Sequence, residues 1–378
     1  MVLGEAFHRQ VANRLAERLE ANGKNAALVF NRENIRYLTG LTFPSSERPL
    51  AACVWADRRV ALFVPQLEAE SAAAGSIRDV RWYAEFPAET TPILWMAREA
   101  GSPLVIDDIP ITDWVTIKAE IEEIEPGDFV TEMRMVKSQP ELDLIQRAAD
   151  FADLALERLF ARLTSGSAER DAIHEVIAVV DTIMRSELGD LYDPLSRPIT
   201  GAIRSGMRAA FPDAPTSNRR LTRGDTVVVE FTASVAGYHA QAGSTFFVGD
   251  PLRDVVRWVE ASVLAQDAAR EAMVPGATAE SIDQAARKVI ERLGFGNMIR
   301  HRTGNGIGLA TSEAPWLVRS QQTKLEPGMV LVNRPGVYVT GRTGARNVET
   351  LVIEEEGARV LNPRIDRWHQ TEARLKEF

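Results

Sequence analysis

The spacing of apolar residues along the chain predicts alternating helices and strands. Val11, Leu15 and Leu19 recur every four residues, so they share one face of a helix that we expect over residues 8–22. Gly23 follows this helix and supplies its stop. Strands that alternate with helices are typical of an α/β domain. Short apolar runs bounded by turn-forming residues predict such strands at residues 26–30, 51–55, 60–64 and 104–106.

A capping sequence around Ser138 marks the entry into a second domain. Ser138 is a favourable N-cap, Pro140 is tolerated in a first helical turn, and Glu141 completes a capping box three residues after the cap. We therefore expect a first domain at residues 1–133 and a second at residues 134–378. In the second domain the pattern predicts helices at about 139–163, 167–187, 252–273 and 279–293, and strands at about 226–233, 244–249, 329–333 and 346–354.

The size and composition of the chain agree with two globular domains. Its 378 residues exceed the size at which one hydrophobic core usually stops growing, and 45% of them are hydrophobic and 26% charged. The formal net charge of -9 makes phosphate backbones and anionic membranes poor partners. Cys53 is the only cysteine, and the N-terminal residues lack the unbroken apolar stretch of a signal peptide. We expect a cytoplasmic protein that binds neither nucleic acid nor membranes.

Six stretches of the chain, taken together, resemble the creatinase, prolidase and aminopeptidase P family. Their order and spacing over nearly the whole chain make the resemblance specific. It implies a creatinase-like N-terminal α/β domain followed by a catalytic-type α+β domain with the pita-bread fold. It also implies a homodimer in which the N-terminal domain of one subunit borders the active site of the other. The six stretches are Asn34 to Gly40, Met135 to Ser138, Gly224 to Thr226, Gly237 with Tyr238, Thr303 to Leu309, and Leu325 to Val330.

The metal ligands of the family are not reproduced in this chain. Its peptidases bind two divalent metal ions with two Asp, one His and two Glu side chains. The resemblance places these ligands at Glu230, Gln241, Asn305, Arg334 and Val348. Four negative charges in the family become one negative and one positive charge here. Because a desolvated divalent cation needs anionic ligands, we expect no metal and no other cofactor. We expect Arg334 to pair with Glu230 in place of the metals.

The surviving polar residues resemble those of metal-free branches of the family. Ectoine hydrolases have a Glu at the place of Glu230 and a Tyr-His pair at the place of Tyr238 and His239. Carried over, Glu230 is a nucleophile or general base and His239 a candidate acid or base. Asp213 stands where creatinase has its acid/base His, and it is the third catalytic candidate. Alternation puts Tyr238 and His239 on opposite faces of a strand, without saying which of them faces Glu230.

Arg48 is the main candidate of the N-terminal domain. It lies eight residues after Gly40, where creatinase has an arginine that reaches the substrate carboxylate across the dimer. A planar guanidinium with five donors suits a carboxylate. The alternative is a loop arginine that is solvated or paired with Glu47. The remaining substrate-binding candidates are Arg334, Arg346, Tyr238, His301, Asn305 and Glu313, with a structural hydrogen bond as the alternative for His301 and scaffold pairing as the alternative for Glu313.

Three functions remain open on these residues. The first is a metal-independent hydrolase of a small non-peptide C–N bond, in an amidine, guanidine, lactam or amide that carries a carboxylate. The second is a catalytically silent homologue that binds a small molecule or peptide, or serves as a scaffold. The third is an Xaa-Pro peptidase-like enzyme or a lyase. The joint presence of Glu230, His239 and Arg48 favours an enzyme, and Glu230 in a structural ion pair favours a scaffold.

Overall fold

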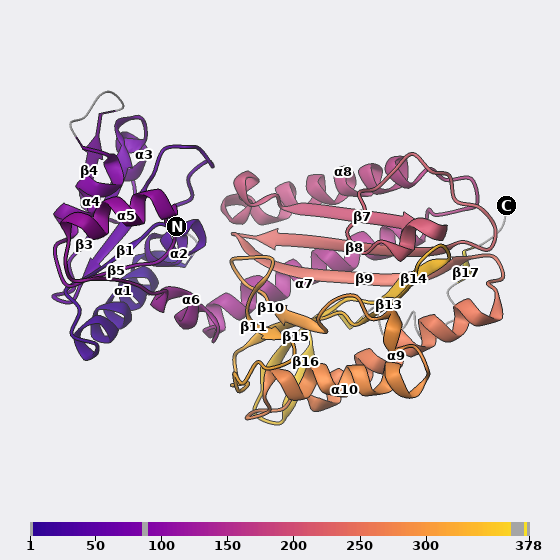
Figure 1. Cartoon of the computed structure of the whole chain (residues 1–378). Helices are drawn as coiled ribbons and strands as arrows, with labels where there is room; N and C mark the ends of the chain where they lie inside the picture. Colours follow the sequence, from indigo (N-terminus) through magenta and orange to yellow (C-terminus); the bar gives the residue numbers. More distant parts are fainter. Residues whose placement is uncertain (1–2, 85–89, 364–373, 376–378) are drawn as a thin grey trace. The chain divides into compact units, whose positions relative to one another are not determined.

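The computed structural model describes residues 3–84, 90–363 and 374–375. The chain divides into two compact units, Met1–Arg134 and Met135–Phe378. The boundary expected from the sequence lies one residue earlier, between residues 133 and 134. Each unit has its own layers of helices and strands (Figure 1).

Unit 1 is built on a six-stranded sheet in the order β4-β3-β2-β1-β5-β6. Strands β1, β2 and β5 are buried along their whole length, which explains why they are continuous apolar runs in the sequence. Helix α2 begins at its cap Asn31 and ends at Gly40, whose φ of 73° favours glycine. The elements are α1 (Gly4–Ala21), β1 (Ala26–Val29), α2 (Arg32–Thr39), β2 (Ala51–Trp55), β3 (Val60–Pro65), α3 (Ala69–Ala73), β4 (Asp79–Tyr83), α4 (Pro92–Ala100), β5 (Leu104–Ile106), α5 (Ile111–Glu120), β6 (Ile124–Pro126) and α6 (Phe129–Arg134).

Unit 2 contains a four-stranded sheet in the order β17-β9-β8-β7, a five-stranded sheet in the order β11-β10-β12-β15-β16, and the hairpin β13-β14. Helices α7 and α8 pack on the first sheet, and α9 and α10 pack together beside the second (Figure 1). The elements are α7 (Gln139–Phe160), α8 (Glu169–Leu188), β7 (Ile199–Ser205), β8 (Thr226–Val235), β9 (Tyr238–Val248), α9 (Arg253–Ala272), α10 (Ala279–Arg292), β10 (Gly304–Gly306), β11 (Glu313–Leu317), β12 (Val330–Asn333), β13 (Gly336–Val339), β14 (Thr343–Arg346), β15 (Glu349–Glu354), β16 (Gly357–Val360) and β17 (Arg374–Leu375).

The predicted capping box opens helix α7. The Ser138 side chain and the backbone N–H of Ser138 both donate to Glu141 Oε2, at 2.7 and 2.8 Å. The other oxygen of the same carboxylate accepts a hydrogen bond from the Tyr238 hydroxyl at 3.0 Å. Glu141 therefore both caps α7 and ties the helix to the first residue of strand β9.

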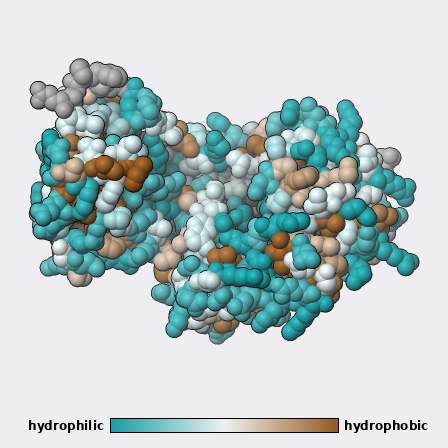
Figure 2. All heavy atoms as spheres, viewed as in Figure 1, coloured by the Kyte–Doolittle hydropathy of each residue, from teal (hydrophilic) through white to brown (hydrophobic). Residues whose placement is uncertain are grey.

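Hydrophilic residues cover most of the face of each unit seen in Figure 2, with hydrophobic residues in small separate patches. Each unit has a buried hydrophobic cluster of its own. Within the described residues, no helix is both long enough and apolar enough to cross a membrane.

Candidate functional site

Glu230 lies in the middle of strand β8, and its carboxylate is bound by arginines from two neighbouring strands. Arg346, the last residue of β14, donates from Nη2 to Glu230 Oε2 in a short ion pair. Arg204 on β7 places Nη1 3.5 Å from the same oxygen. The side chains of Arg204 and Arg346 are only 8% and 4% exposed, whereas that of Glu230 is 19% exposed. Solvent therefore reaches the carboxylate but scarcely reaches its two cations.

Side-chain alternation fixes which residues share the face of Glu230. The register pairs Glu230 with Gly243 and Ser234 with His239, so His239 lies on the Glu230 face of the sheet. Tyr238 points the other way, toward α7, where its hydroxyl donates to Glu141.

His239 is nevertheless not adjacent to Glu230. It stands opposite Ser234, four residues along β8, which is about 13 Å at the rise of a strand. Its ring Nδ1 is 3.1 Å from the carbonyl oxygen of Gly308. Because a carbonyl oxygen only accepts, His239 donates there and holds its ring against the β10–β11 connection.

Arg334 binds a different partner from the one expected. Its Nη2 donates to Asn305 Oδ1 at 2.7 Å, and Arg302 Nη2 donates to the same oxygen at 3.3 Å. No contact between Arg334 and Glu230 is among the hydrogen bonds and ion pairs of the described residues, although the carboxylate acts on the guanidinium at longer range. Burial lowers the pKa of Arg334, and the charges of Arg346 and Arg302 act in the same direction.

A tyrosine next to Arg346 hydrogen-bonds to an imidazole. The Tyr338 hydroxyl lies 2.8 Å from His301 Nε2, and Tyr338 and Arg346 act on each other electrostatically. His301 Nδ1 is 2.7 Å from the carbonyl oxygen of Arg302, so Nδ1 carries the proton and Nε2 accepts from Tyr338. Burial, with help from the charges of Arg346 and Arg334, lowers the pKa of His301 to about 4. The imidazole is therefore neutral at neutral pH.

Asp213, the third predicted catalytic residue, lies between two backbone contacts of the arginines that bind Glu230. Asp213 is exposed, and the backbone carbonyls on either side of it, those of Pro212 and Ala214, accept hydrogen bonds from Arg346 and Arg204. Its charge therefore acts on both arginines.

Glu313 is buried in an ion pair with a lysine. Its Oε1 accepts from Lys137 Nζ at 2.7 Å, and the two side chains are 5% and 2% exposed. The backbone N–H of Ala310 donates to its other oxygen at 3.3 Å. Each of these contacts ties Glu313 to the scaffold.

Sequence reasoning missed three residues of the site: Arg204, Arg302 and Tyr338. Arg204 belongs to strand β7, which contains Thr200, Gly201 and Ser205 and has no apolar run to reveal it. Arg302 and Tyr338 lie next to predicted residues or in the hairpin β13-β14, and no motif singled them out.

Comparison with known proteins decides the family. The profile of metallopeptidase family M24 matches residues 143–355, and that of the creatinase/prolidase N-terminal domain matches residues 12–122. The chain belongs to metallopeptidase family M24.

Relatives along nearly the whole chain agree with this family. The chain is 31% identical over 371 residues to the probable dipeptidase PepE of Mycobacterium tuberculosis, covering 95% of each protein. It is 31% identical over 301 residues to the Xaa-Pro dipeptidase of Pyrococcus furiosus, covering 79% of this chain and 83% of that one.

Solved structures of similar proteins confirm the predicted fold. Dipeptidase PepE from Mycobacterium ulcerans has a TM-score of 0.84 and 28% identity, with 94% of this chain and 96% of that one covered. The prolidase from Pyrococcus horikoshii OT3 has a TM-score of 0.79 and 28% identity, with 93% and 98% covered. A creatinase-type N-terminal α/β domain is therefore followed by an M24 pita-bread domain. The named relatives are peptide-bond hydrolases, and they do not single out the metal-free branches.

The residues at the five positions where the resemblance places the metal ligands do not fit a metal pair. Val348 offers no donor atom and is fully buried, and Arg334 brings a cation. Gln241 is buried with Oε1 lacking a hydrogen-bond partner, and Asn305 Oδ1 is occupied by two guanidinium groups. Among the described residues, no group of three or more His, Cys, Asp or Glu side chains is placed to hold a metal ion. Glu230 is the one carboxylate of the set.

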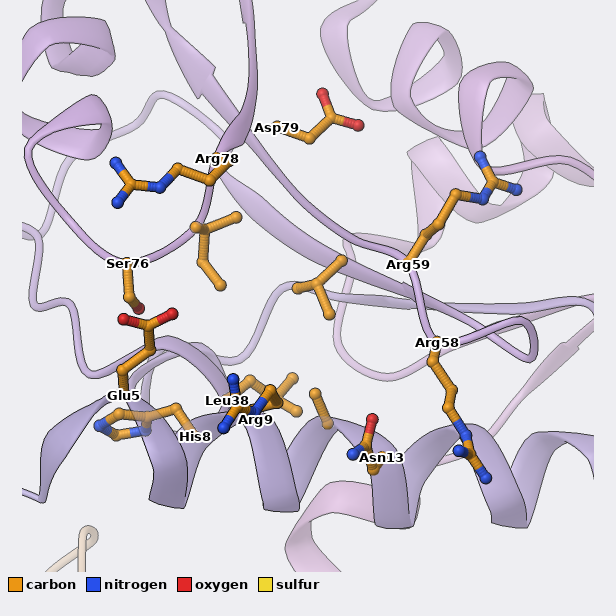
Figure 3. A pocket seen from close by; sticks show the side chains of 13 residues that line it. Glu5, His8, Arg9, Asn13, Leu38, Arg58, Arg59, Ser76, Arg78 and Asp79 are labelled. Carbon is orange, nitrogen blue, oxygen red and sulfur yellow. The ribbon is translucent and has the colours of Figure 1, made fainter.

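Two of the hollows among the described residues lie within unit 1. One of about 370 Å³ is bordered by Arg48, whose Nη1 lies 2.9 Å from Glu47 Oε1. The other has about 390 Å³ and is bordered by helix α1 on one side and by the segment around Arg78 on the other (Figure 3). Its charged and polar lining residues are Glu5, His8, Arg9, Asn13, Arg58, Arg59, Ser76, Arg78 and Asp79. None of them is among the predicted site residues.

Proposed function

We propose that the chain is an M24-fold hydrolase that cleaves a C–N bond in a small, carboxylate-bearing substrate without the metal pair of metallopeptidases. One observation carries the proposal. At the place of a family metal ligand stands a partly exposed carboxylate, Glu230, which Arg346 and Arg204 hold in a fixed orientation. An amidine, guanidine, lactam or amide is the class of bond we expect it to attack.

In the proposed reaction Glu230 either attacks the electrophilic carbon or removes a proton from the water that does so. In both cases the oxygen of water ends on the carbon, the C–N bond breaks, and a proton passes to the leaving nitrogen. Arg346 is then a positioning residue for Glu230. The imidazole nearer to this ion pair in its interactions is that of His301, whose partner Tyr338 is acted on electrostatically by Arg346 and Glu230, whereas His239 reaches Gly308. His301 with Tyr338 is therefore the better-placed route for the proton.

The test is activity measured together with metal content. Protein purified without added metal is analysed for bound metals and assayed with cyclic amidines, guanidino acids, N-acylated amino acids and Xaa-Pro dipeptides, with and without a chelator. We expect less than stoichiometric metal, activity that the chelator leaves unchanged, and a loss of at least about a hundredfold in Glu230→Gln. Glu355→Gln, which alters an exposed glutamate of the same unit, is the matched control. Unchanged activity in Glu230→Gln would remove this carboxylate from the mechanism.

A dipeptidase is the second candidate, because the relatives that carry that name match 79% and 95% of this chain. An Xaa-Pro dipeptide also has a carboxylate and a cleavable C–N bond. Both candidate functions therefore use a substrate with a carboxylate, and they differ in the kind of C–N bond cleaved and in the need for a metal. Activity on Xaa-Pro dipeptides that the chelator abolishes and manganese restores would select the dipeptidase. No turnover of any compound in the panel would select the silent binding homologue.

We further propose that the chain forms a homodimer in which Arg48 of one subunit binds the substrate carboxylate at the site of the other. Arg48 is 32% exposed at its side chain and borders a hollow, which agrees with a role at a binding surface. Mixed dimers test this. Arg48→Ala is expected to raise KM only where the altered N-terminal domain is combined with an intact Glu230 in the other subunit.

A further inference from the structure

The surroundings of Glu230 contain more positive than negative charge. Four guanidinium groups, which we call the arginine cluster, lie in this region. The charge of Glu230 acts on three of them, the exposed Asp213 acts on Arg204 and Arg346, and the fourth, Arg302, acts on Arg334. The formal charge is four positive and two negative, an excess of two. Elsewhere in unit 2 a buried charge can have a single matched partner, as Lys137 has in Glu313. The arginine cluster consists of Arg204, Arg302, Arg334 and Arg346.

Two donor atoms of the arginine cluster, Nε of Arg346 and Nε of Arg302, are buried without a hydrogen-bond partner among the described residues. Nη1 of Arg204 is buried and has only its ion-pair contact of 3.5 Å with Glu230 Oε2. The side chains of Arg204 and Arg346 are more than nine-tenths buried. Since leaving a buried charged donor unpaired is costly, these atoms indicate an anionic partner that the described residues do not supply.

The pKa shifts of two of these arginines agree with a missing anionic partner. Burial lowers the pKa of Arg204, and the charge of Arg346 lowers it further. Burial also lowers the pKa of Arg302. Like charges held close together in a partly dry site repel one another, and an added anion relieves that repulsion.

We propose that the arginine cluster binds a small ligand with two negative charges, held between Arg204 and Arg334 beside Glu230. A dianion cancels the formal excess of two, whereas a monoanion leaves one positive charge uncompensated. Dicarboxylates and phosphate groups share the required chemistry, because both offer pairs of oxygens that match a guanidinium fork. The inference rests on the proposed function for the statement that this ligand is the substrate. The site that binds a metal cation in the M24 peptidases thus selects an anion here.

Calorimetric titration tests the charge preference without turnover. The probes are succinate and inorganic phosphate as dianions and propionate as the monoanion, all at constant low ionic strength because salt screens such contacts. We expect one dianion to bind at least tenfold more tightly than propionate. Preference for succinate assigns a dicarboxylate, and preference for phosphate assigns a phosphate compound. Equal affinity for all three probes overturns the inference.

Two substitutions give effects of opposite sign that misfolding cannot mimic. Arg334→Gln is expected to weaken binding of the preferred dianion at least tenfold. Glu230→Gln removes a negative charge beside the ligand and is expected to tighten the same binding several-fold, although it abolishes the proposed hydrolysis. Arg319→Gln, at an exposed arginine of the same unit, is the control that should bind as the unaltered chain does. Unchanged binding in Arg334→Gln overturns the inference.

The two proposals fail in different ways. If the chain binds dianions through Arg334 but hydrolyses none of the panel compounds, the anion site is supported and the proposed hydrolase function is refuted. If the chain hydrolyses neutral or singly charged substrates through Glu230 but shows no preference for dianions, the hydrolase function is supported and the anion site is refuted.

Discussion

Replacing Lys137 with Met should destabilise unit 2 strongly, because the lysine neutralises a buried glutamate. Lys137 Nζ and Glu313 Oε1 lie 2.7 Å apart, and their side chains are 2% and 5% exposed. Breaking a buried ion pair by removing one partner typically costs about 3–5 kcal/mol, since the other charge stays buried. Met keeps the length and the apolar stem of lysine, so the loss should come from charge rather than from packing. We expect Lys137→Met to lower the free energy of unfolding of unit 2 by about 3–5 kcal/mol.

The double variant Lys137→Met with Glu313→Gln completes the test. Once no charge is left unpaired, most of the lost stability should return, to within about 2 kcal/mol of the unaltered chain. Urea denaturation, followed by hydrogen exchange of peptides from β10 and β11, measures unit 2 separately. The matched control is Arg319→Met, which breaks an exposed pair with Glu291 and should cost less than about 1 kcal/mol. A loss below about 1 kcal/mol in Lys137→Met, or no recovery in the double variant, would refute the scaffold role of Glu313. A raised KM without lost stability in Glu313→Gln would instead assign it to substrate binding.

Three further predictions concern neighbouring residues. His301 has its pKa lowered from 6.5 to about 4, so it adds stability that is present above pH 6.5 and is lost, up to about 3 kcal/mol, as pH falls toward 4. Urea midpoints measured against pH should show this slope, and His301→Asn should flatten it; an unchanged slope would contradict the assignment. Tyr238→Phe removes the hydrogen bond to Glu141 and should cost about 1 kcal/mol by thermal melting, whereas a neutral result would mean that this bond adds nothing. Gly304→Ala puts a Cβ 2.0 Å from the carbonyl oxygen of Val332 and should cost about 3 kcal/mol or more; a folded variant of normal melting temperature would refute this.

Apolar runs and caps made most of the fold predictable from sequence. The predicted strands at residues 51–55 and 104–106 match β2 and β5, and the Ser138 capping box opens α7 as expected. Strand β7 was missed because Gly201 and its polar neighbours interrupt the apolar pattern on which the prediction relied. Missing this strand also concealed Arg204, since a residue of unassigned structure cannot be placed beside Glu230.

The contacts of the site depended on information that the sequence does not contain. Alternation showed that Tyr238 and His239 face opposite sides, and only the pairing of β8 with β9 showed that His239 shares the Glu230 side. The partner of Glu230 was predicted to be Arg334. In the structure Arg346 takes that place, because Thr245 on the same face hydrogen-bonds to both the N–H and the carbonyl of Arg346 and fixes its backbone there. Backbone hydrogen bonds of this kind decide which of several long side chains reaches a carboxylate.

At this site the backbone geometry constrains some residues, and the charge of the site depends on others. A Cβ on Gly304 or Gly306 would lie 2.0 or 2.2 Å from a carbonyl oxygen of a neighbouring strand, so glycine is required there whatever the site binds. Asn305 between them has no such constraint, since its side chain points to Arg334 and Arg302. Exchanging the side chain at such a position changes the charge of the site and leaves the backbone unchanged. Similarity to the M24 dipeptidases therefore establishes the family and fold of this chain, and titration with anions tests the ligand that we propose for its arginines.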